Sequence, residues 1–282
     1  MTRFRIAHSG ITWGYTASTA APAVRDISDV GYAAYESIGD IIEAYDDREP
    51  ETFAGLLARY DLPLAAVYCV ARFHNPTHAA EVGGGPRADV VRQATRGNEL
   101  GATTLVLQAA GRDGRPYEHP IQWEGMAAMF NGIAARVAKL GMRTAVHPHT
   151  GTLIETRDEI DAIMGAVNPD LVGFAPDTGQ IAKAGADMLD TLQAYQDRIW
   201  HVHLKDWAGG RETGYAEYEA IGSGVLDIAG IFAILDRADY QGWVTVELDG
   251  TPSSPRPPRE AAEMSKRYLS ELLGEQAIWT VS

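Results

Sequence analysis

The chain has 282 residues, of which 45% are hydrophobic, and this suits one large α/β barrel or two small domains. Its formal net charge of −14 opposes nucleic acid phosphates and leaves no basic footprint for DNA or RNA. No apolar run is long enough to cross a bilayer, and the N-terminal residues lead into a predicted strand without the apolar region of a signal peptide. The single cysteine, Cys69, allows no internal disulfide, so we expect a protein of the reducing cytoplasm.

Predicted strands and helical patterns alternate along the whole chain, and no change in composition suggests a linker. Strands are expected near 4–7, 33–36, 64–70, 103–108, 143–147, 171–175, 201–206 and 243–248. Helices are expected near 51–60, 87–100, 121–140, after 156, at 186–197, from 227 and after 258. Alternation of this kind favours parallel strands joined by helices, and eight such units predict a (β/α)8 TIM barrel in a single domain, 1–282.

Two helices have clear local signals. The helix at 121–140 shows apolar residues at the spacing of one helical face, at Met126, Met129, Phe130, Ile133, Val137 and Leu140. Thr156 with Glu159 three residues on predicts a capping box at the start of a later helix.

The stretch HVHLKD at 201–206 predicts a strand with a polar face turned into the barrel. Side chains alternate along a strand, so His201, His203 and Lys205 share one face and Val202 and Leu204 the other. The alternative is a half-exposed strand whose polar residues lie in water. We favour the barrel, because three inward polar residues are costly to bury without a use.

Carboxylates and imidazoles follow four consecutive predicted strands, at the strand ends where the chemistry of such barrels lies. They are His147, His149 and Glu155 after the fifth strand, Asp177 after the sixth, His203 and Asp206 on the seventh, and Glu247 and Asp249 after the eighth. Clustered carboxylates repel each other unless a cation separates them, and mostly oxygen ligands favour Mn²⁺ or Mg²⁺, with Co²⁺ or Zn²⁺ as alternatives. The competing interpretation is surface ion pairing with Lys205, Arg198 or Arg211.

Five stretches resemble the xylose-isomerase-like sugar isomerase/epimerase superfamily, and most closely its inosose dehydratase branch. They are HPHTGTLIET (147–156), DTG (177–179), HVHLKD (201–206), IGSGVLD (221–227) and GWVTVE (242–247). The resemblance covers the second half of the chain more strongly than the first.

The resemblance implies a metal held by Glu, Asp, His and Glu. Asp177, His203 and Glu247 match this pattern directly, whereas His147 stands where epimerases of the family carry the first Glu. We therefore expect Glu155 as the fourth ligand, with His147 as the second choice. Gln180 replaces the usual His of the family's Asp-Thr-Gly-His motif, and because an amide does not exchange protons at neutral pH it is expected to orient substrate.

The implied chemistry acts on a keto-cyclitol or keto-sugar through an enediolate that the metal stabilises. Glu155 and Glu247 are expected to move the proton beside the carbonyl, and Lys205 or His149 to protonate a departing hydroxyl. Loss of that hydroxyl gives dehydration, as in an inosose dehydratase. Return of the proton to another face or carbon gives the alternative, a ketose 3-epimerase or an aldose–ketose isomerase.

Several further residues are expected to bind substrate, namely Trp13, Glu36, His147, Gln180 and Arg211. Trp13 would form a wall of the sugar pocket or belong to the core, and Glu36 would bond a hydroxyl or be structural. His201 is expected to be a hydrogen-bonded core histidine. Gly222-Ser223-Gly224 is interpreted as a tight turn rather than a phosphate site, which favours an unphosphorylated small-molecule substrate.

Two other classes remain open. A nuclease like the apurinic endonucleases, which share this barrel, would need more metal-binding histidines than the eight present, and a basic surface. A non-catalytic barrel that binds sugar or serves as a partner subunit would hold no metal. Assembly into a homo-oligomer is compatible with the sequence.

Overall fold

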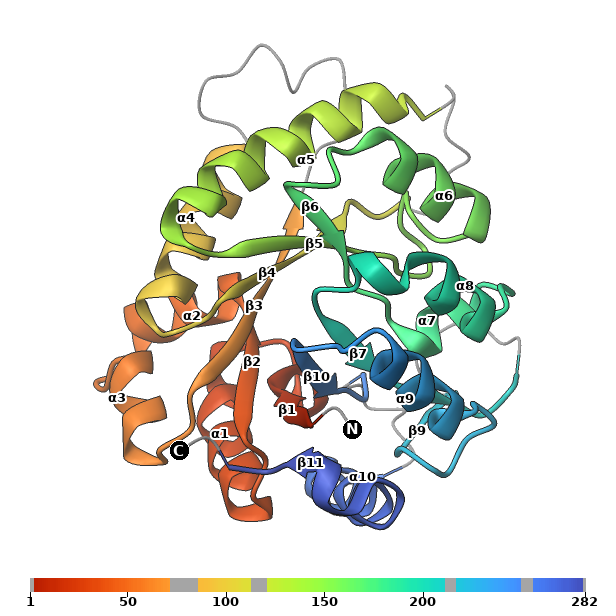
Figure 1. The fold of residues 1–282 in the computed structure, drawn as a ribbon. Coiled ribbons are helices and arrows are strands. Elements are labelled where there is room, and N and C mark those ends of the chain that lie inside the picture. Colours follow the sequence, from red (N-terminus) through yellow and green to blue (C-terminus); the bar gives the residue numbers. More distant parts are fainter. Residues whose placement is uncertain (1–2, 72–85, 113–120, 211–216, 250–255, 281–282) are drawn as a thin grey trace.

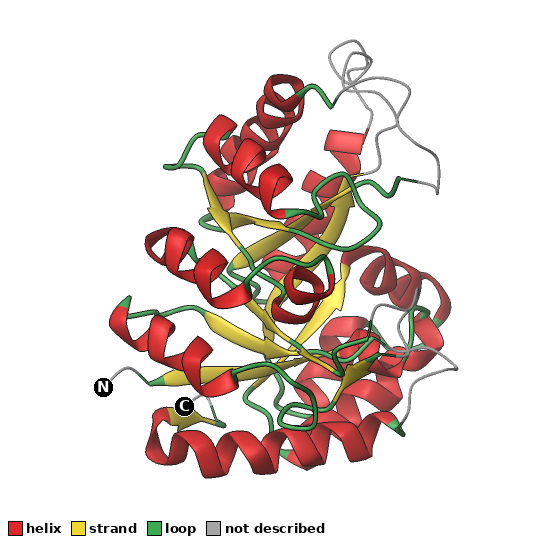
Figure 2. Cartoon of the chain, turned by 90° about the vertical axis from the view of Figure 1, so that its right-hand side faces the viewer, coloured by secondary structure: helices red, strands yellow, loops and turns green. Residues whose placement is uncertain are grey.

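The computed structural model describes residues 3–71, 86–112, 121–210, 217–249 and 256–280. Its strands form a parallel barrel with helices packed around the outside (Figure 1; Figure 2). Neighbouring strands follow the order β6-β5-β4-β3-β2-β1-β10-β7, and isolated parallel bridges from Phe174 to Ile199 and from Asp177 to His203 connect the two ends of this series. The expected (β/α)8 TIM barrel is therefore confirmed.

The barrel strands are β1 (Phe4–Ser9), β2 (Ala34–Ile38), β3 (Leu64–Ala71), β4 (Thr104–Ala109), β5 (Arg143–His147), β6 (Val172–Phe174), β7 (Val202–Leu204) and β10 (Trp243–Val246). A short C-terminal strand, β11 (Ala277–Ile278), pairs with the start of β1. The hairpin of β8 (Asp206–Trp207) and β9 (Tyr218–Glu219) follows β7.

The α-helices are α1 (Ala17–Val30), α2 (Gly39–Arg48), α3 (Phe53–Arg59), α4 (Pro86–Glu99), α5 (Trp123–Val137), α6 (Arg157–Ala166), α7 (Thr178–Lys183), α8 (Met188–Tyr195), α9 (Ile228–Arg237) and α10 (Pro258–Leu273). Short 3-10 turns lie at Gly10–Trp13, Ala138–Leu140, Gln196–Arg198 and Gly274–Gln276. Thr156 and Glu159 form the predicted capping box of α6, and Asp227 caps α9 by accepting the N–H of Gly230 at 2.8 Å. In the described part of the chain, no helix has the length and hydrophobicity needed to cross a membrane.

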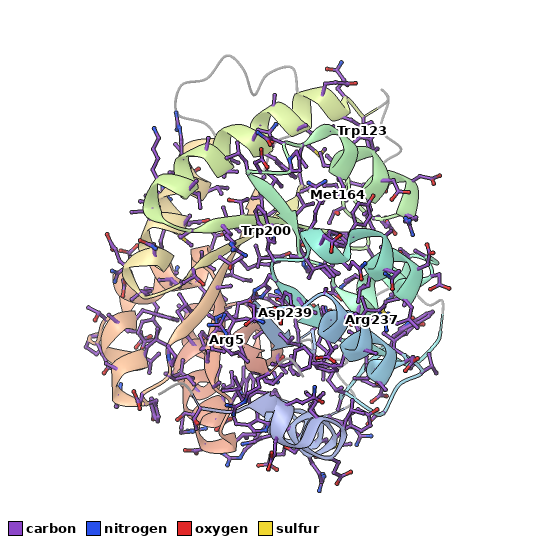
Figure 3. The ribbon with its side chains drawn as sticks, in the orientation of Figure 1. Arg5, Trp123, Met164, Trp200, Arg237 and Asp239 are labelled. Atoms are coloured by element: carbon purple, nitrogen blue, oxygen red, sulfur yellow. The ribbon has the colours of Figure 1, made fainter. Side chains whose placement is uncertain are left out.

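Large side chains close the amino-terminal end of the barrel. Trp200, which is labelled in Figure 3, lies beside the barrel strands. It packs directly on Gly173, where a Cβ atom would lie 2.2 Å from the indole, so only glycine fits. The Arg143 guanidinium lies 5.5 Å from the Trp200 ring, and that of Arg5 lies 4.7 Å from the Trp243 ring. The carboxyl-terminal end is thereby left as the end at which polar groups can gather.

A layer of small residues separates this plug from the polar end. Ala66, Val106, Ala145 and Ala175 form one buried cluster, with Tyr68 and Trp200 packed against it. Inward side chains recur every second residue along a strand. Since the side chains of this layer are small, the polar residues two positions further along each strand lie deep within the barrel.

Candidate metal and catalytic site

Four buried side chains converge at the carboxyl ends of β5, β6, β7 and β10. The Nε2 atom of His147 lies 3.9 Å from Oδ2 of Asp177, and Nδ1 of His203 lies 3.3 Å from Oε2 of Glu247. Ligand atoms of His147, Asp177 and His203 all lie within 4.8 Å of one another. The structure thus brings together three of the expected metal ligands, Asp177, His203 and Glu247, with His147, the second choice for the fourth.

Local structure determines which atom each residue offers. Asp177 is the N-cap of α7, and its Oδ1 accepts the N–H of Gln180 at 2.9 Å, so Oδ2 is the oxygen left facing the cluster. His203 is hydrogen-bonded through Nε2 to Oε1 of Glu36 at 2.6 Å, so Nδ1 faces the cluster. Asp177 Oδ2 and His203 Nδ1 are both buried without a hydrogen-bond partner among the described residues.

This donor set fits a divalent cation. Two imidazole nitrogens and two carboxylate oxygens suit Zn²⁺, Mn²⁺ or Co²⁺. The carboxylate behind His203 is the partner that commonly orients a metal-bound histidine. A cation would also bind these two buried atoms, which make no hydrogen bond among the described residues although the Lys205 ammonium lies 3.1 Å from Asp177 Oδ2.

Of the two roles expected of Glu36, a substrate contact and a structural one, its contacts support the structural role. Its Oε2 accepts bonds from His201 Nε2 and Thr245 Oγ1, both at 2.8 Å, and its Oε1 binds His203. Burial would raise the pKa of Glu36, but the charges of His203 and His201 bring that pKa far below its ordinary value. For His203, burial lowers the pKa, but Glu36 and Glu247 outweigh burial and raise the pKa to about 9. Glu36 therefore lies behind the site and orients His203.

Lys205 is fully buried among three carboxylates. Its Nζ lies 3.1 Å from Asp177 Oδ2, 2.8 Å from Glu247 Oε1 and 2.8 Å from Asp249 Oδ2, and 4.8 Å from the Tyr218 ring centre. Burial would lower the pKa of Lys205, but the three carboxylates raise it well above its ordinary value. Burial also raises the pKa of Glu247. The expected catalytic residues Lys205 and Glu247 are thus in direct contact.

His149 and Gln180 lie beside this cluster and contact each other. The Gln180 side-chain nitrogen is 2.9 Å from His149 Nε2 and 3.4 Å from Asp249 Oδ2. The Gln180 oxygen accepts the Thr150 hydroxyl at 2.5 Å. Asp249 also accepts the hydroxyl of Tyr15 at 3.2 Å, which connects the first βα loop to the last.

The structure does not bring Glu155, expected as the fourth ligand and as a base, into the cluster. Its Oε2 accepts the N–H of Gly151 at 3.0 Å and lies 3.8 Å from Arg112 Nε. The chain turns away after His147 through Gly151, whose φ is 76°, and this turn carries Glu155 towards the start of α6.

Trp13 and Arg211 complete the expected set. The indole N–H of Trp13 donates to Asp26 Oδ2 at 2.9 Å, and its ring lies 5.4 Å from His8, so Trp13 packs partly buried against the core. Arg211 lies outside the described residues.

Tyr68 and Gln108 were not anticipated as site residues. The Tyr68 ring stacks 6.0 Å from His203 and meets His147 edge-on at 5.3 Å, and its hydroxyl donates to the side-chain oxygen of Gln108. Gln108 pairs with His147 in the β4–β5 register. The alternation of side chains along β3 places Tyr68 on the same inward face as Ala66, which indicated a residue of the barrel interior. Because the residues around Tyr68 are mostly apolar, the sequence did not mark it as part of a polar site.

A family model described as a xylose isomerase-like TIM barrel matches residues 24–271. The chain belongs to the xylose isomerase-like TIM barrel family. It is 32% identical over 174 residues to an inosose dehydratase of Lactiplantibacillus plantarum, covering 57% of this chain and 58% of that one. It is 30% identical over 204 residues to an inosose dehydratase of Clostridium beijerinckii, covering 63% and 67%. The match to the first relative thus spans less than two thirds of its length.

Solved structures show the same fold at low identity. The IOLI protein with a bound zinc atom has a TM-score of 0.73 at 15% identity, covering 97% of this chain and 99% of that one. A D-allulose 3-epimerase from Methylomonas sp. in complex with D-allulose has a TM-score of 0.71 at 19% identity, covering 96% and 98%.

In this member of the xylose isomerase-like family, the glycine-rich turn after β9 is filled by the chain's own carboxylate. Asp206 Oδ2 accepts the N–H groups of Gly222 and Gly224, both at 2.9 Å, and Oδ1 accepts those of Trp207 at 2.8 Å and Leu226 at 3.2 Å. A Cβ atom at Gly224 would lie 2.3 Å from the Asp206 carboxylate, so glycine is required there. Backbone N–H groups in such turns commonly bind anions, and here Asp206 is the anion.

Proposed function

We propose that this protein is a divalent-metal-dependent lyase that removes water from a keto-cyclitol or keto-sugar, as an inosose dehydratase does. The observation that carries the proposal is the contact between Glu247 and Lys205 beside His203 and Asp177. A base and an acid thus adjoin a set of metal-binding atoms. The two inosose dehydratase relatives support the same reaction.

We propose Asp177, His203, Glu247 and His147 as the metal ligands, with His147 in the place first expected of Glu155. Mn²⁺ is the proposed metal, and Zn²⁺, Co²⁺ and Mg²⁺ are alternatives; the zinc in the IOLI protein supports a divalent ion. When bound, the cation would polarise the substrate carbonyl and acidify the neighbouring C–H bond.

Glu247 and Lys205 would each carry out one of the two proton transfers. Glu247 removes the proton from the carbon beside the carbonyl, giving an enediolate. The bond from the next carbon to its hydroxyl then breaks as the C=C bond forms, and the hydroxyl oxygen takes a proton from the Lys205 ammonium and leaves as water. Because Glu247 Oε1 lies 2.8 Å from Lys205 Nζ, the proton can return directly to the amine for the next turnover.

The remaining polar groups would orient the substrate hydroxyls. Gln108 and Tyr68 line the β3–β4 side of the cluster, and Gln180 lines the β6 side. Asp206 fills the glycine-rich turn with a negative charge, which supports an unphosphorylated substrate.

The test is incubation of the Mn²⁺-loaded protein with scyllo-inosose in deuterated water. We expect an enone or diketone absorbance together with loss of water. Glu247→Gln should abolish the reaction, and Glu155→Gln, which alters a carboxylate outside the cluster, is the matched control and should retain it. Epimerised or isomerised ketoses without water loss would instead favour the epimerase or isomerase alternative. Cleavage of abasic DNA would favour the nuclease.

A further inference from the structure

We propose that Lys205 is the resident cation of this site. Its ammonium holds the carboxylates together while no divalent ion is bound, and it competes with that ion for Asp177 and Glu247. This inference rests on the proposed metal dependence. It concerns a further role for Lys205, namely control of metal affinity.

The oxygen atoms of Asp177 carry the first step of the argument. Oδ1 accepts the N–H of Gln180 at 2.9 Å, and Oδ2 faces His147 and Lys205, so Oδ2 is the oxygen through which we expect a cation to bind. Oδ2 already lies 3.1 Å from Lys205 Nζ and 3.9 Å from His147 Nε2. The ammonium and a divalent ion would therefore both require this one oxygen.

Glu247 and Asp249 provide the second step. Glu247 directs Oε1 to Lys205 at 2.8 Å and Oε2 to His203 at 3.3 Å, so it borders both cations. Asp249 instead binds Lys205 at 2.8 Å, the Tyr15 hydroxyl at 3.2 Å and the Gln180 side-chain nitrogen at 3.4 Å. Asp249 thus gives the ammonium a carboxylate to keep when a metal takes Asp177.

Only the end of Lys205 has to move in this exchange. Its backbone is held by the Thr178 hydroxyl, which accepts the Lys205 N–H at 2.9 Å and donates to the Lys205 carbonyl at 2.6 Å. Its stem packs on Gly179, where a Cβ atom would lie 2.9 Å from Lys205 Cγ. The base of the side chain is therefore fixed, and displacement is confined to the ammonium end.

The test measures metal binding to the substrate-free protein. Lys205→Met removes the charge and retains an unbranched apolar stem. We expect the dissociation constant for Mn²⁺, measured by competition with a fluorescent chelator, to fall at least about tenfold, because a like charge next to the ligands is removed. Lys183→Met is the control, since the Lys183 ammonium pairs with Glu217 at 3.6 Å, and it should change the constant less than about twofold.

A second measurement, the melting temperature, tests the proposal even if K205M does not fold without metal. Without metal, K205M should melt below the wild type, because three buried carboxylates lose their cation, and Mn²⁺ should raise its melting temperature more than it raises that of the wild type. Lys205→Arg keeps the charge and should show no gain in affinity. K205M that stays unfolded in excess Mn²⁺ would overturn the proposal.

Mn²⁺ binding by the wild type distinguishes failure of this inference from failure of the proposed function. If the wild type binds Mn²⁺ and K205M binds it equally or more weakly, Lys205 is not a competitor and the proposed function stands. If the wild type binds no divalent ion, both proposals are overturned.

Discussion

The side-chain nitrogen of Gln180 lies 2.9 Å from Nε2 of His149, and this contact determines where the proton of His149 resides. The Gln180 oxygen accepts the backbone N–H of Thr150 at 3.2 Å, which fixes the orientation of the amide because a backbone N–H can only donate. Gln180 therefore donates to Nε2, and His149 Nδ1 donates to the Thr150 carbonyl at 2.8 Å. In this state His149 has no proton on Nε2 to give to a leaving group, which supports Lys205 as the proposed donor.

The first prediction concerns this hydrogen-bonded pair. Nitrogen-15 NMR of histidine-labelled protein should show His149 as the neutral tautomer protonated on Nδ1. Gln180→Leu removes the donor to Nε2 and should shift the His149 signals while leaving those of His8 unchanged. A His149 protonated on Nε2 in the wild type would contradict the assigned orientation of the amide.

The second prediction distinguishes the two candidates for the fourth metal ligand. His147→Ala should weaken Mn²⁺ binding at least about tenfold, because it removes a nitrogen that lies 3.9 Å from Asp177 Oδ2. Glu155→Ala should leave binding within about twofold, since Glu155 contacts Gly151 and Arg112. The measurement is chelator competition, and the reverse order of effects would return the ligand role to Glu155.

The sequence predicted helix starts and strand bounds where they are determined by residues close together in the chain. Thr156 with Glu159 and Asp227 mark helix starts through contacts three residues apart, and the bounds expected for β5 match Arg143–His147. α1 was not predicted because alanines supply much of its buried face and Pro22 lies inside it.

Long-range contacts could not be read in the same way. Glu36 meets His201 across 165 positions, so its partner follows from closure of the barrel rather than from any local pattern. Glu155 lies only eight positions beyond His147, yet the turn at Gly151 separates the two. The strand ends predicted which residues gather, while the loops between them determined which side chains point into the site.

The third prediction tests the glycine-rich turn. Asp206→Asn replaces one carboxylate oxygen with an amide group that cannot accept the two backbone N–H groups it faces. We expect the free energy of unfolding to fall by about 2–4 kcal/mol. Asp227→Asn is the control, because Asn caps a helix as well as Asp does, and it should be nearly neutral. Equal urea midpoints for the two variants would contradict this role.

The fourth prediction concerns His8, which is buried between the rings of Trp13 at 5.4 Å and Tyr32 at 4.8 Å. Burial lowers its pKa to about 4, although a hydrogen bond to the Ser9 carbonyl opposes the shift. The unfolded chain therefore takes up this proton first as the pH falls below about 6.5, and His8 alone should cost about 2 kcal/mol of stability at pH 5 relative to neutral pH. His8→Gln should remove that part of the pH dependence in urea unfolding. An unchanged difference between pH 7.5 and pH 5 would contradict the neutral state of buried His8.

The two ends of the strand series, β6 and β7, are joined by isolated bridges, one of which pairs Asp177 with His203. Both residues are proposed ligands, and each stands on a different side of this seam. An ion bound to both would join β6 to β7 at a junction of isolated bridges, so that metal binding would also stabilise the closed barrel.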